Sequence, residues 1–213
     1  MAQRKRMFVS RKDESVRLFK NPVLEALSHV HPATPVVVYT PVVAILLYMS
    51  AQQFSIATIV TAFLVGVVLW TFTEYSLHRW VFHYEPKSEW GQKIHFLIHG
   101  VHHDYPNDST RLVMPLLVSA PLAVLFYYLF AWIFAPYHLP LFAGFVAGYI
   151  AYDTIHYATH HWRMDGKIGR WLKKHHMRHH FQDDQQYFGV SSPLWDYVFG
   201  TMPKRENRSS QTA

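Results

Sequence analysis

The sequence contains no cysteine, and this absence excludes several kinds of chemistry. A chain of 213 residues without cysteine has no disulfide, no metal site built on thiolates and no cysteine nucleophile. Any metal must therefore be held by histidine and carboxylate side chains, and the sequence has 16 histidines to offer.

Charged residues are also scarce, at 16% of the chain against about 25% in a typical soluble domain. Two stretches, 26–73 and 112–152, contain no Asp, Glu, Lys or Arg at all. A spanning helix needs about 20 mostly apolar residues, so each stretch has room for two. A soluble helical core is the alternative, but such long charge-free stretches are rare in soluble proteins of this size. We therefore expect an all-α integral membrane protein with four transmembrane helices in two hairpins, at 35–51, 55–77, 112–133 and 140–157.

The charges that remain indicate how the chain is oriented. All 20 Lys and Arg residues lie before residue 26, between 73 and 112, or after 152. The positive-inside rule places these segments in the cytoplasm. The net charge of +6 is thus assigned to a membrane face and not to nucleic acid, for which no binding motif is present. We expect a basic cytoplasmic N-terminal segment (1–34), a membrane-embedded domain (35–203) and a polar tail (204–213).

Two further patterns are the basic N-terminal start and a pair of glycines in the last expected span. The basic start lacks the short apolar run and cleavage site of a signal peptide, and we interpret it as a solvated, disordered tail rather than a lipid-binding helix. Gly144 and Gly148 form a GxxxG in the last expected span, which is typical of a helix-packing contact.

Most histidines fall in the expected cytoplasmic segments and form four motifs. These are one HxxxxH (78, 83), one HxxxH (156, 160) and two HxxHH (99, 102, 103 and 176, 179, 180). On a helix, offsets of three and four share a face, so three imidazoles can converge on one point or bridge two nearby points. A five-residue step turns about 140° and suits two different metals or a helix end better than one shared metal.

Ten imidazoles are too many for a single ion, because catalytic zinc sites usually have three protein ligands and structural ones four. We therefore predict a dimetal centre with about five histidines per ion, held in a cytoplasmic, histidine-rich helical cap. An all-imidazole shell suits Fe, Zn, Cu or Ni and does not suit Mg or Ca. With no anionic protein ligand, the site favours oxygen chemistry over hydrolysis.

Carboxylates beside the motifs are expected to support the ligands. A ligating imidazole usually donates its other N–H to an acceptor. Glu74, four residues before His78, and Asp153, three before His156, are expected to orient those rings by accepting their second N–H, since a charge at the edge of a span is costly unless paired. Asp104 and Asp196 are weaker candidates. The remaining clustered histidines, at 95, 161 and 175, are expected to lie outside the ligand set.

The order of the motifs resembles the fatty acid hydroxylase superfamily, with the nearest likeness to its sphingolipid fatty acid 2-hydroxylase branch. The likeness covers about residues 70–203 and is carried by FTEYSLHRWVFH (72–83), HFLIHGVHHDYPNDSTRLVMP (95–115), YDTIHYATHH (152–161) and LKKHHMRHHFQDDQQYFGVSSPLWDYVFGT (172–201). At KKHHMRHH the family usually has a tyrosine before the first ligand, so the ligand here is His176 and not His175. The resemblance implies a dimetal site held by His78, His83, His99, His102, His103, His156, His160, His176, His179 and His180.

The resemblance also implies an activity. It indicates an O₂-dependent monooxygenase that hydroxylates C2 of the acyl chain of a fatty acid or ceramide, with two metal ions, iron being favoured and zinc also accepted. Tyr152 and Asp153 are expected to contact the polar head of this substrate. Because only about 34 residues precede the first span, and not the fused cytochrome b5 domain common in fungal and animal members, we expect a separate electron donor. Cytochrome b5 or a ferredoxin-type protein with its reductase would serve. The membrane would be the endoplasmic reticulum in a eukaryote or the inner membrane in a bacterium.

Two alternatives remain open at this point. The first is another histidine-box membrane oxygenase, such as a sterol oxidase, a carotenoid hydroxylase or a desaturase. Desaturases share HxxxxH and HxxHH motifs, but the HxxxH at the end of the last span and the FGVSSPLWDYVFGT stretch favour the hydroxylase. The second is a metal transporter, which would place ligands at mid-membrane, whereas the centres of the expected spans contain none.

Overall fold

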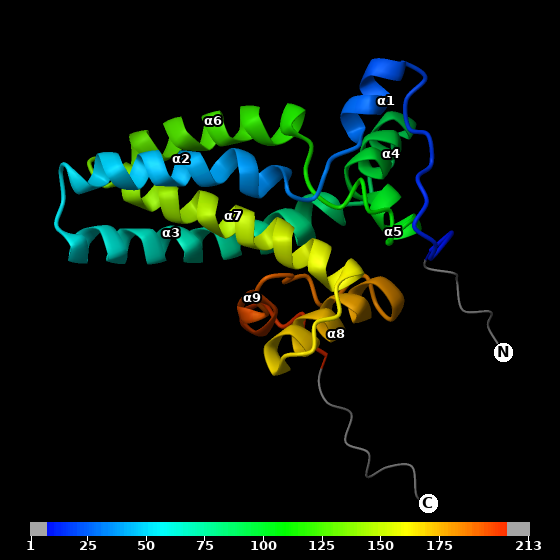
Figure 1. The fold of residues 1–213 in the computed structure, drawn as a ribbon. Coiled ribbons are helices and arrows are strands. Elements are labelled where there is room, and N and C mark those ends of the chain that lie inside the picture. The colour runs from blue at the N-terminus through cyan, green and yellow to red at the C-terminus, as the bar shows by residue number, and fades with distance from the viewer. Residues whose placement is uncertain (1–7, 204–213) are drawn as a thin grey trace, which may run out of the picture.

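The computed structural model describes residues 8–203. Every regular secondary-structure element in that range is a helix. Four long helices lie side by side, and short helices gather at one end of them as a cap, where both described chain ends also lie (Figure 1). The long helices are α2 (Thr34–Ala51), α3 (Ile56–Ser76), α6 (Leu116–Ile133) and α7 (His138–His161). The cap contains α1 (Pro22–Ser28), η1 (Leu77–Phe82), α4 (Glu89–His95), η2 (Phe96–Gly100), α5 (Val101–Asp104), α8 (Lys167–Phe181) and α9 (Leu194–Val198). The polar tail expected at 204–213 falls outside the described residues.

Three helices are long and apolar enough to cross a membrane: α2, α3 with its continuation to Phe82, and α6. Their outer faces expose large apolar side chains, among them Val37, Tyr48, Ile56, Leu125 and Trp132. Continuous exposed apolar surface of this kind marks a face that meets lipid or a partner. The prediction of a helical protein with apolar spans is therefore confirmed for three helices.

The fourth expected span, 140–157, lies within α7, but α7 is not among the helices that are apolar enough to cross a membrane by composition alone. It carries Asp153 and several histidines toward its C-terminal end, and most of its length is buried. The helix packs against α2, α3 and α6. A helix covered by its neighbours on several sides needs no continuous lipid-compatible surface, which explains why its hydropathy is lower. The third expected span, 112–133, begins later than predicted, because Pro115 ends the extended segment that precedes α6.

The closest helix contact joins α3 to α7. A Cβ atom on Gly144 would lie 1.9 Å from the carbonyl oxygen of Phe63, and one on Gly66 would lie 2.0 Å from that of Leu141. Only glycine permits backbones to approach this closely. The GxxxG motif therefore makes the packing contact that the sequence predicts. This contact positions the cap, since α3 leads directly into His78 and α7 carries His156.

The N-terminal segment is attached to the cap, which corrects the interpretation of the basic start as a solvated tail for residues 8–20. The N–H groups of Val9 and Ser10 donate to the carbonyl of Asp104 at 2.8 and 3.1 Å. The side-chain amide of Asn107 donates to the carbonyl of Arg11 at 2.6 Å. Most of these donors and acceptors are backbone groups, which every residue carries. The amino-acid composition of the segment therefore does not indicate that it is attached. Residues 1–7 lie outside the described range.

Arg111 anchors this N-terminal segment. Its guanidinium donates to Glu25 at 2.6 Å and to the carbonyl of Val16, and it lies 3.5 Å from Asp108. The Arg111 side chain is only 5% exposed. The N–H groups of Phe19 and Leu18, which donate to Glu25, together with His29 and Arg111, hold the pKa of Glu25 at about 2. One buried cation therefore ties the N-terminal segment to the loop that follows α5.

Replacing Arg111 with alanine should release the N-terminal segment from the cap. Removal of a buried cation leaves Glu25 and the Val16 carbonyl without their partner. We expect amide hydrogen exchange in residues 8–20 to speed up by at least about tenfold. The control is Arg163→Ala, because the Arg163–Asp165 ion pair is 92% and 72% exposed and such pairs contribute little. Equal exchange in both variants would contradict the anchoring role.

The same attachment should depend on pH in one direction. Glu25 has a folded-state pKa of about 2, below its ordinary value of 4.5. Its contribution is therefore complete above pH 4.5 and is lost as the pH falls toward 2. Exchange protection of residues 8–20, corrected for the intrinsic rate at each pH, should decline only in that window. A decline that begins above pH 5.5 would show that another group controls the attachment.

Candidate metal centre

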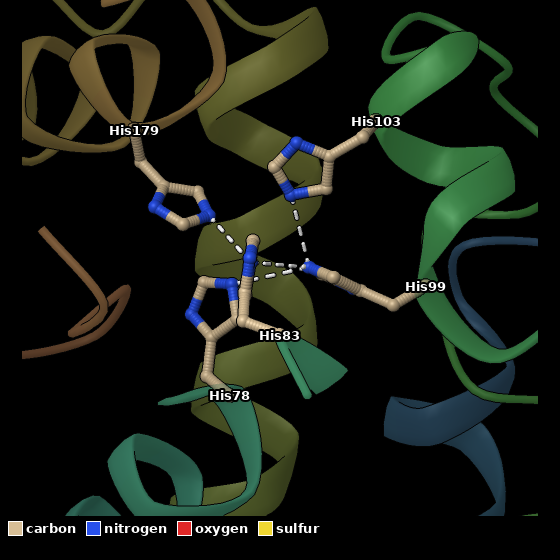
Figure 2. A group of neighbouring side chains, drawn as sticks. All are labelled: His78, His83, His99, His103 and His179. Carbon is tan, nitrogen blue, oxygen red and sulfur yellow. Dashed lines mark hydrogen bonds between the residues drawn. The ribbon is translucent and has the colours of Figure 1, made fainter. Parts of the chain in front are cut away.

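The ten histidines predicted from the sequence meet inside the cap as two groups of five. In each group, one nitrogen of every ring lies within 4.8 Å of those of the other rings. We define group A as His78, His83, His99, His103 and His179, and group B as His102, His156, His160, His176 and His180. Figure 2 shows the rings of group A pointing toward one another from three separate parts of the chain.

Each HxxHH motif serves both groups. In the first, His99 and His103 belong to group A and His102 to group B. In the second, His176 and His180 belong to group B and His179 to group A. The first and last histidines of each motif are four residues apart and point toward the same group. The histidine three residues after the first is rotated to the other side of that direction and points toward the neighbouring group. Of the two arrangements left open by the spacing, the structure therefore has the one that bridges two points.

His78 and His83 lie in the same group, although their five-residue step would separate them on an α-helix. The chain forms the π-helical turn η1 here, and the N–H of His83 donates to the carbonyl of His78 at 3.2 Å. A turn closed by an i to i+5 hydrogen bond brings residues five apart closer to the same side of the helix than an α-helical turn does. His83 also sits at the end of this turn. Of the two explanations that the spacing allowed, two metals or a helix end, the helix end is observed. The second π-helical turn, η2, carries His99.

Helix α8 brings histidines into both groups because it is amphipathic. Leu172 and the histidines at 175, 176, 179 and 180 are buried on its inner face. Lys167, Arg170 and Lys174 are exposed on its outer face. The residues of each face recur three or four positions apart, as expected of a helix with one side against a core.

The Nε2 atoms have more close neighbours than hydrogen bonds between the rings can account for. In group A, Nε2 of His99 lies 3.2 Å from that of His78, 3.2 Å from that of His83 and 3.0 Å from that of His103. In group B the corresponding separations are 2.9 to 3.1 Å. A neutral imidazole has one N–H and cannot bond three neighbours through one nitrogen. Nitrogens about 2.1 Å from a shared cation lie about 3 Å apart at right angles, so both groups fit a metal ion.

Burial keeps these rings neutral. His176, His179 and His180 are at most 1% exposed. Burial lowers the pKa of His103 to about 3. Burial likewise lowers the pKa of the other buried cap histidines well below 6.5, namely His99, His102, His176, His179 and His180. Neutral imidazole is the form that binds a metal through its lone pair.

Backbone carbonyls fix two rings of group A. Nδ1 of His78 donates to the carbonyl of Phe188 at 2.5 Å, and Nδ1 of His179 donates to that of Gln186 at 2.7 Å. A carbonyl only accepts, so Nδ1 carries the hydrogen in both rings and Nε2 keeps its lone pair for a metal. We refer to residues 186–191 as the acceptor loop.

Two buried carboxylates hold the acceptor loop in place. Glu74 accepts from the N–H groups of Val190 and Ser191 at 2.7 and 2.8 Å and from the Ser191 hydroxyl. Asp196 accepts from the N–H groups of Phe188 and Gly189 at 2.8 and 2.9 Å. The expectation that Glu74 accepts directly from a ligating ring is thus corrected, because the acceptor loop occupies the space beside this carboxylate.

The other predicted residues occupy more varied positions. Asp153 is 2% exposed, and its Oδ2 atom has no hydrogen-bond partner among the described residues, so no bond to His156 is formed. Tyr152 stacks on the ring of His156 at a centroid distance of 5.7 Å. Asp104 meets the N-terminal segment through its carbonyl. The histidines at 95, 161 and 175 lie in neither group, and His175 is 3.1 Å from Asp196.

An apolar cavity lies beside the centre, among α2, α3, α6 and α7. About 450 Å³ of space free of atoms lies in this cavity and in the open solvent at its mouth taken together. At the cap end its wall includes Leu77, the neighbour of His78, and Met114. Phe126 and Phe142 lie farther along the same wall. The cavity thus lies among the long helices, and its wall includes the residue that directly precedes His78 of group A.

Comparison with known proteins agrees with this architecture. The fatty acid hydroxylase family pattern matches residues 63–201. The dihydroceramide fatty acyl 2-hydroxylase FAH1 of Arabidopsis thaliana is 42% identical over 193 residues, which are 89% of this chain and 81% of that protein. The fatty acid 2-hydroxylase of Mus musculus is 33% identical over 90% of this chain and 58% of its own length. A solved structure of full-length scs7p, with only its hydroxylase domain visible, has a TM-score of 0.82 and 37% identity, covering 87% of this chain and 71% of that one. The resemblance found in the sequence is confirmed, and the chain is an enzyme of the fatty acid hydroxylase family.

Proposed function

We propose that this enzyme is a dimetal membrane monooxygenase that adds a hydroxyl group at C2 of a fatty acyl chain, in a free fatty acid or a ceramide. The observation that carries the proposal is the meeting of ten Nε2 atoms in two adjacent groups of five. The names of the relatives, a dihydroceramide fatty acyl 2-hydroxylase and a fatty acid 2-hydroxylase, support the position of the hydroxyl group and the substrate class.

The proposed reaction consumes one O₂, two electrons and two protons, converts the C2–H bond to C2–OH and releases one water. A bound metal pair, iron being preferred, would supply the activation of O₂. Zinc also fits an all-imidazole shell, but it has no redox chemistry and would not serve this step. The protein's part is to hold the pair through ten neutral imidazoles and to keep water away. The burial of His176, His179 and His180 at 1% exposure or less supports this role.

The proposed membrane topology has four spans, with α7 as the fourth beside α2, α3 and α6. The lower hydropathy of α7 is consistent with a span shielded by other helices. The cap and the basic segment 1–34 would face the cytoplasm, joined to a membrane-embedded domain at 35–203 and a polar tail at 204–213. The membrane would be the endoplasmic reticulum or a bacterial inner membrane, depending on the host.

The substrate is proposed to enter from the lipid. The apolar cavity is suited to an alkyl chain, since its walls are formed largely by aromatic and aliphatic side chains. Tyr152 and Asp153 are proposed to contact the polar head of the lipid. The free Oδ2 atom of Asp153 supports this, because a buried acceptor without a partner is costly and a hydroxyl or amide N–H of the lipid would satisfy it.

Electrons are proposed to come from a separate donor, either cytochrome b5 or a ferredoxin-type protein with its reductase. The reaction needs two electrons, and among the described residues no group of metal-binding side chains other than groups A and B could hold an electron-transfer centre. A purified enzyme supplied with O₂ and substrate alone should therefore make no product until such a donor is added.

Two other functions are less well supported. A sterol oxidase, carotenoid hydroxylase or desaturase would use the same histidine motifs, but the relatives found are 2-hydroxylases. A metal transporter would need ligands along a path through the spans. Both histidine groups instead lie at the cap end of the long helices, and neither includes a residue from the middle of a span.

Lipid profiling of a host that makes no 2-hydroxylated lipids tests the proposal. Cells expressing the enzyme and a compatible electron donor should accumulate 2-hydroxy acyl chains, detected by mass spectrometry of hydrolysed lipids. Cells expressing His180→Ala serve as the control. A new double bond or a hydroxylated sterol, with no 2-hydroxy acid, would refute the proposed activity in favour of a related oxygenase.

A further inference from the structure

The Nδ1 atoms of the two histidine groups meet different surroundings. In group A, His78 and His179 donate to backbone carbonyls at 2.5 and 2.7 Å. In group B, the Nδ1 atoms of four rings are buried and have no hydrogen-bond partner among the described residues: His156, His160, His176 and His180. Nδ1 of His156 lies near the carbonyl of Leu112 but does not reach hydrogen-bond geometry. Backbone acceptors are thus provided for two rings of group A, whereas four rings of group B have none among the described residues.

The acceptors of group A belong to a rigidly built turn. Tyr187, between the two accepting carbonyls, has a φ of 62° and is 3% exposed. A tyrosine in this left-handed region is unusual and persists only where the surroundings enforce it. Its N–H donates to the carbonyl of Thr201, and its ring packs edge-on against His175 at 5.2 Å. Asp196, which is fully buried, fixes the N–H groups that follow.

This difference bears on metal affinity. An acceptor on Nδ1 holds the ring in one orientation and makes Nε2 a stronger donor to a metal. Loss of such a partner typically lowers metal affinity by about 10- to 100-fold. When Nε2 binds a metal, the hydrogen of the neutral ring is on Nδ1, so an Nδ1 that is buried without an acceptor is then an unsatisfied donor. The orientation of such a ring is set by packing alone.

We propose that the two metal sites are unequal, with group A binding its ion more tightly and filling first, and group B holding a more readily exchanged ion. The inference rests on the proposed dimetal centre. It concerns the order and strength of metal loading, which can be measured without turnover.

Metal titration of the purified, metal-free enzyme tests the inequality. Zn²⁺ is added in competition with a chromophoric chelator, and the binding curve should show two steps whose Kd values differ by at least about tenfold. His83→Ala in group A and His160→Ala in group B form a matched pair, because both rings are half-buried. The first variant should lose the tight step and the second the weak step. Circular dichroism at equal protein concentration verifies that both variants remain helical.

The acceptor loop is tested separately with Asp196→Asn. This change removes one of the two oxygen acceptors that fix the N–H groups of Phe188 and Gly189. The tight step should weaken by about 10- to 100-fold, and the weak step should stay where it is. Asp165→Asn, at an exposed carboxylate, is the control and should change neither step.

The outcomes separate this inference from the proposed function. Two equal steps, or loss of the tight step in His160→Ala, would overturn the inequality while leaving the dimetal centre in place. Absence of any Zn²⁺ binding would overturn both. Two unequal steps in an enzyme that makes no 2-hydroxy product would support the inequality and refute the proposed activity alone.

Discussion

Alanine at His99 should abolish formation of the hydroxylated product and empty the group A site. His99 has the most central ring of that group, with its Nε2 atom 3.0 to 3.2 Å from three other Nε2 atoms. Its removal takes away one of the five ligands of the shared ion. It also opens a cavity beside Phe82, whose ring stacks on the ring of His99. We expect product to fall by more than about 100-fold and the metal content of the purified protein to fall from two ions per chain toward one.

His95→Ala is the matched control for this experiment. His95 lies one helical turn before His99 and belongs to neither histidine group. Its replacement should leave both the product and the metal content close to those of the unmodified enzyme. A fully metallated and active His99→Ala protein would contradict the assignment of group A, and equal losses in both variants would show only that this segment is intolerant of change.

Leucine at Gly144 should disrupt the whole centre from a distance. A Cβ atom at this position would lie 1.9 Å from the carbonyl oxygen of Phe63, and because the obstacle is backbone no side-chain rotation relieves the clash. Overpacking typically costs about 1–3 kcal/mol and more where the backbone itself must move. α3 and α7 would separate, and they position ligands of both groups. We expect the unfolding midpoint in detergent to fall by several degrees and the metal content to fall with it.

Ala151→Leu is the control for Gly144→Leu, because Ala151 is an exposed position on the same helix. It adds the same side chain at a position where solvent-exposed space is available. Its unfolding midpoint and metal content should match those of the unmodified enzyme. If Gly144→Leu also unfolded at the unmodified midpoint with full metal, the close approach of α3 to α7 would not be needed to assemble the centre.

The identity of the ligand candidates could be predicted from the sequence because histidine spacing is a direct consequence of helix geometry. His156 and His160 need only one helical face, and the HxxHH motifs need only two adjacent faces. The grouping of His78 with His83 was harder to predict, since it depends on a π-helical turn that spacing does not reveal.

The supporting structure was much less predictable, for a physical reason. The acceptors for His78 and His179 are backbone carbonyls, which every residue carries, so no side-chain pattern marks them. Glu74 was recognised as a supporting residue, but its actual partners lie more than 100 positions away and could not be derived from local spacing. The N-terminal segment likewise attaches through backbone groups, and a basic composition alone indicates solvent exposure.

The prediction of spans is confirmed for the helices that expose an apolar face, and it stays a prediction for α7. Exposed faces of α2 and α6 must be apolar if they meet lipid, so hydropathy identifies them. α7 is enclosed by other helices and can therefore accommodate Asp153 and the histidines of its last turns. Hydropathy alone underestimates such a central helix.

Metal analysis combined with X-ray absorption spectroscopy on the purified enzyme tests the central claim most directly. The account predicts two ions per chain, each surrounded by about five nitrogen ligands at about 2.1 Å, with a second metal visible in the outer shell. A single ion per chain, or a shell dominated by oxygen ligands, would contradict the dimetal centre.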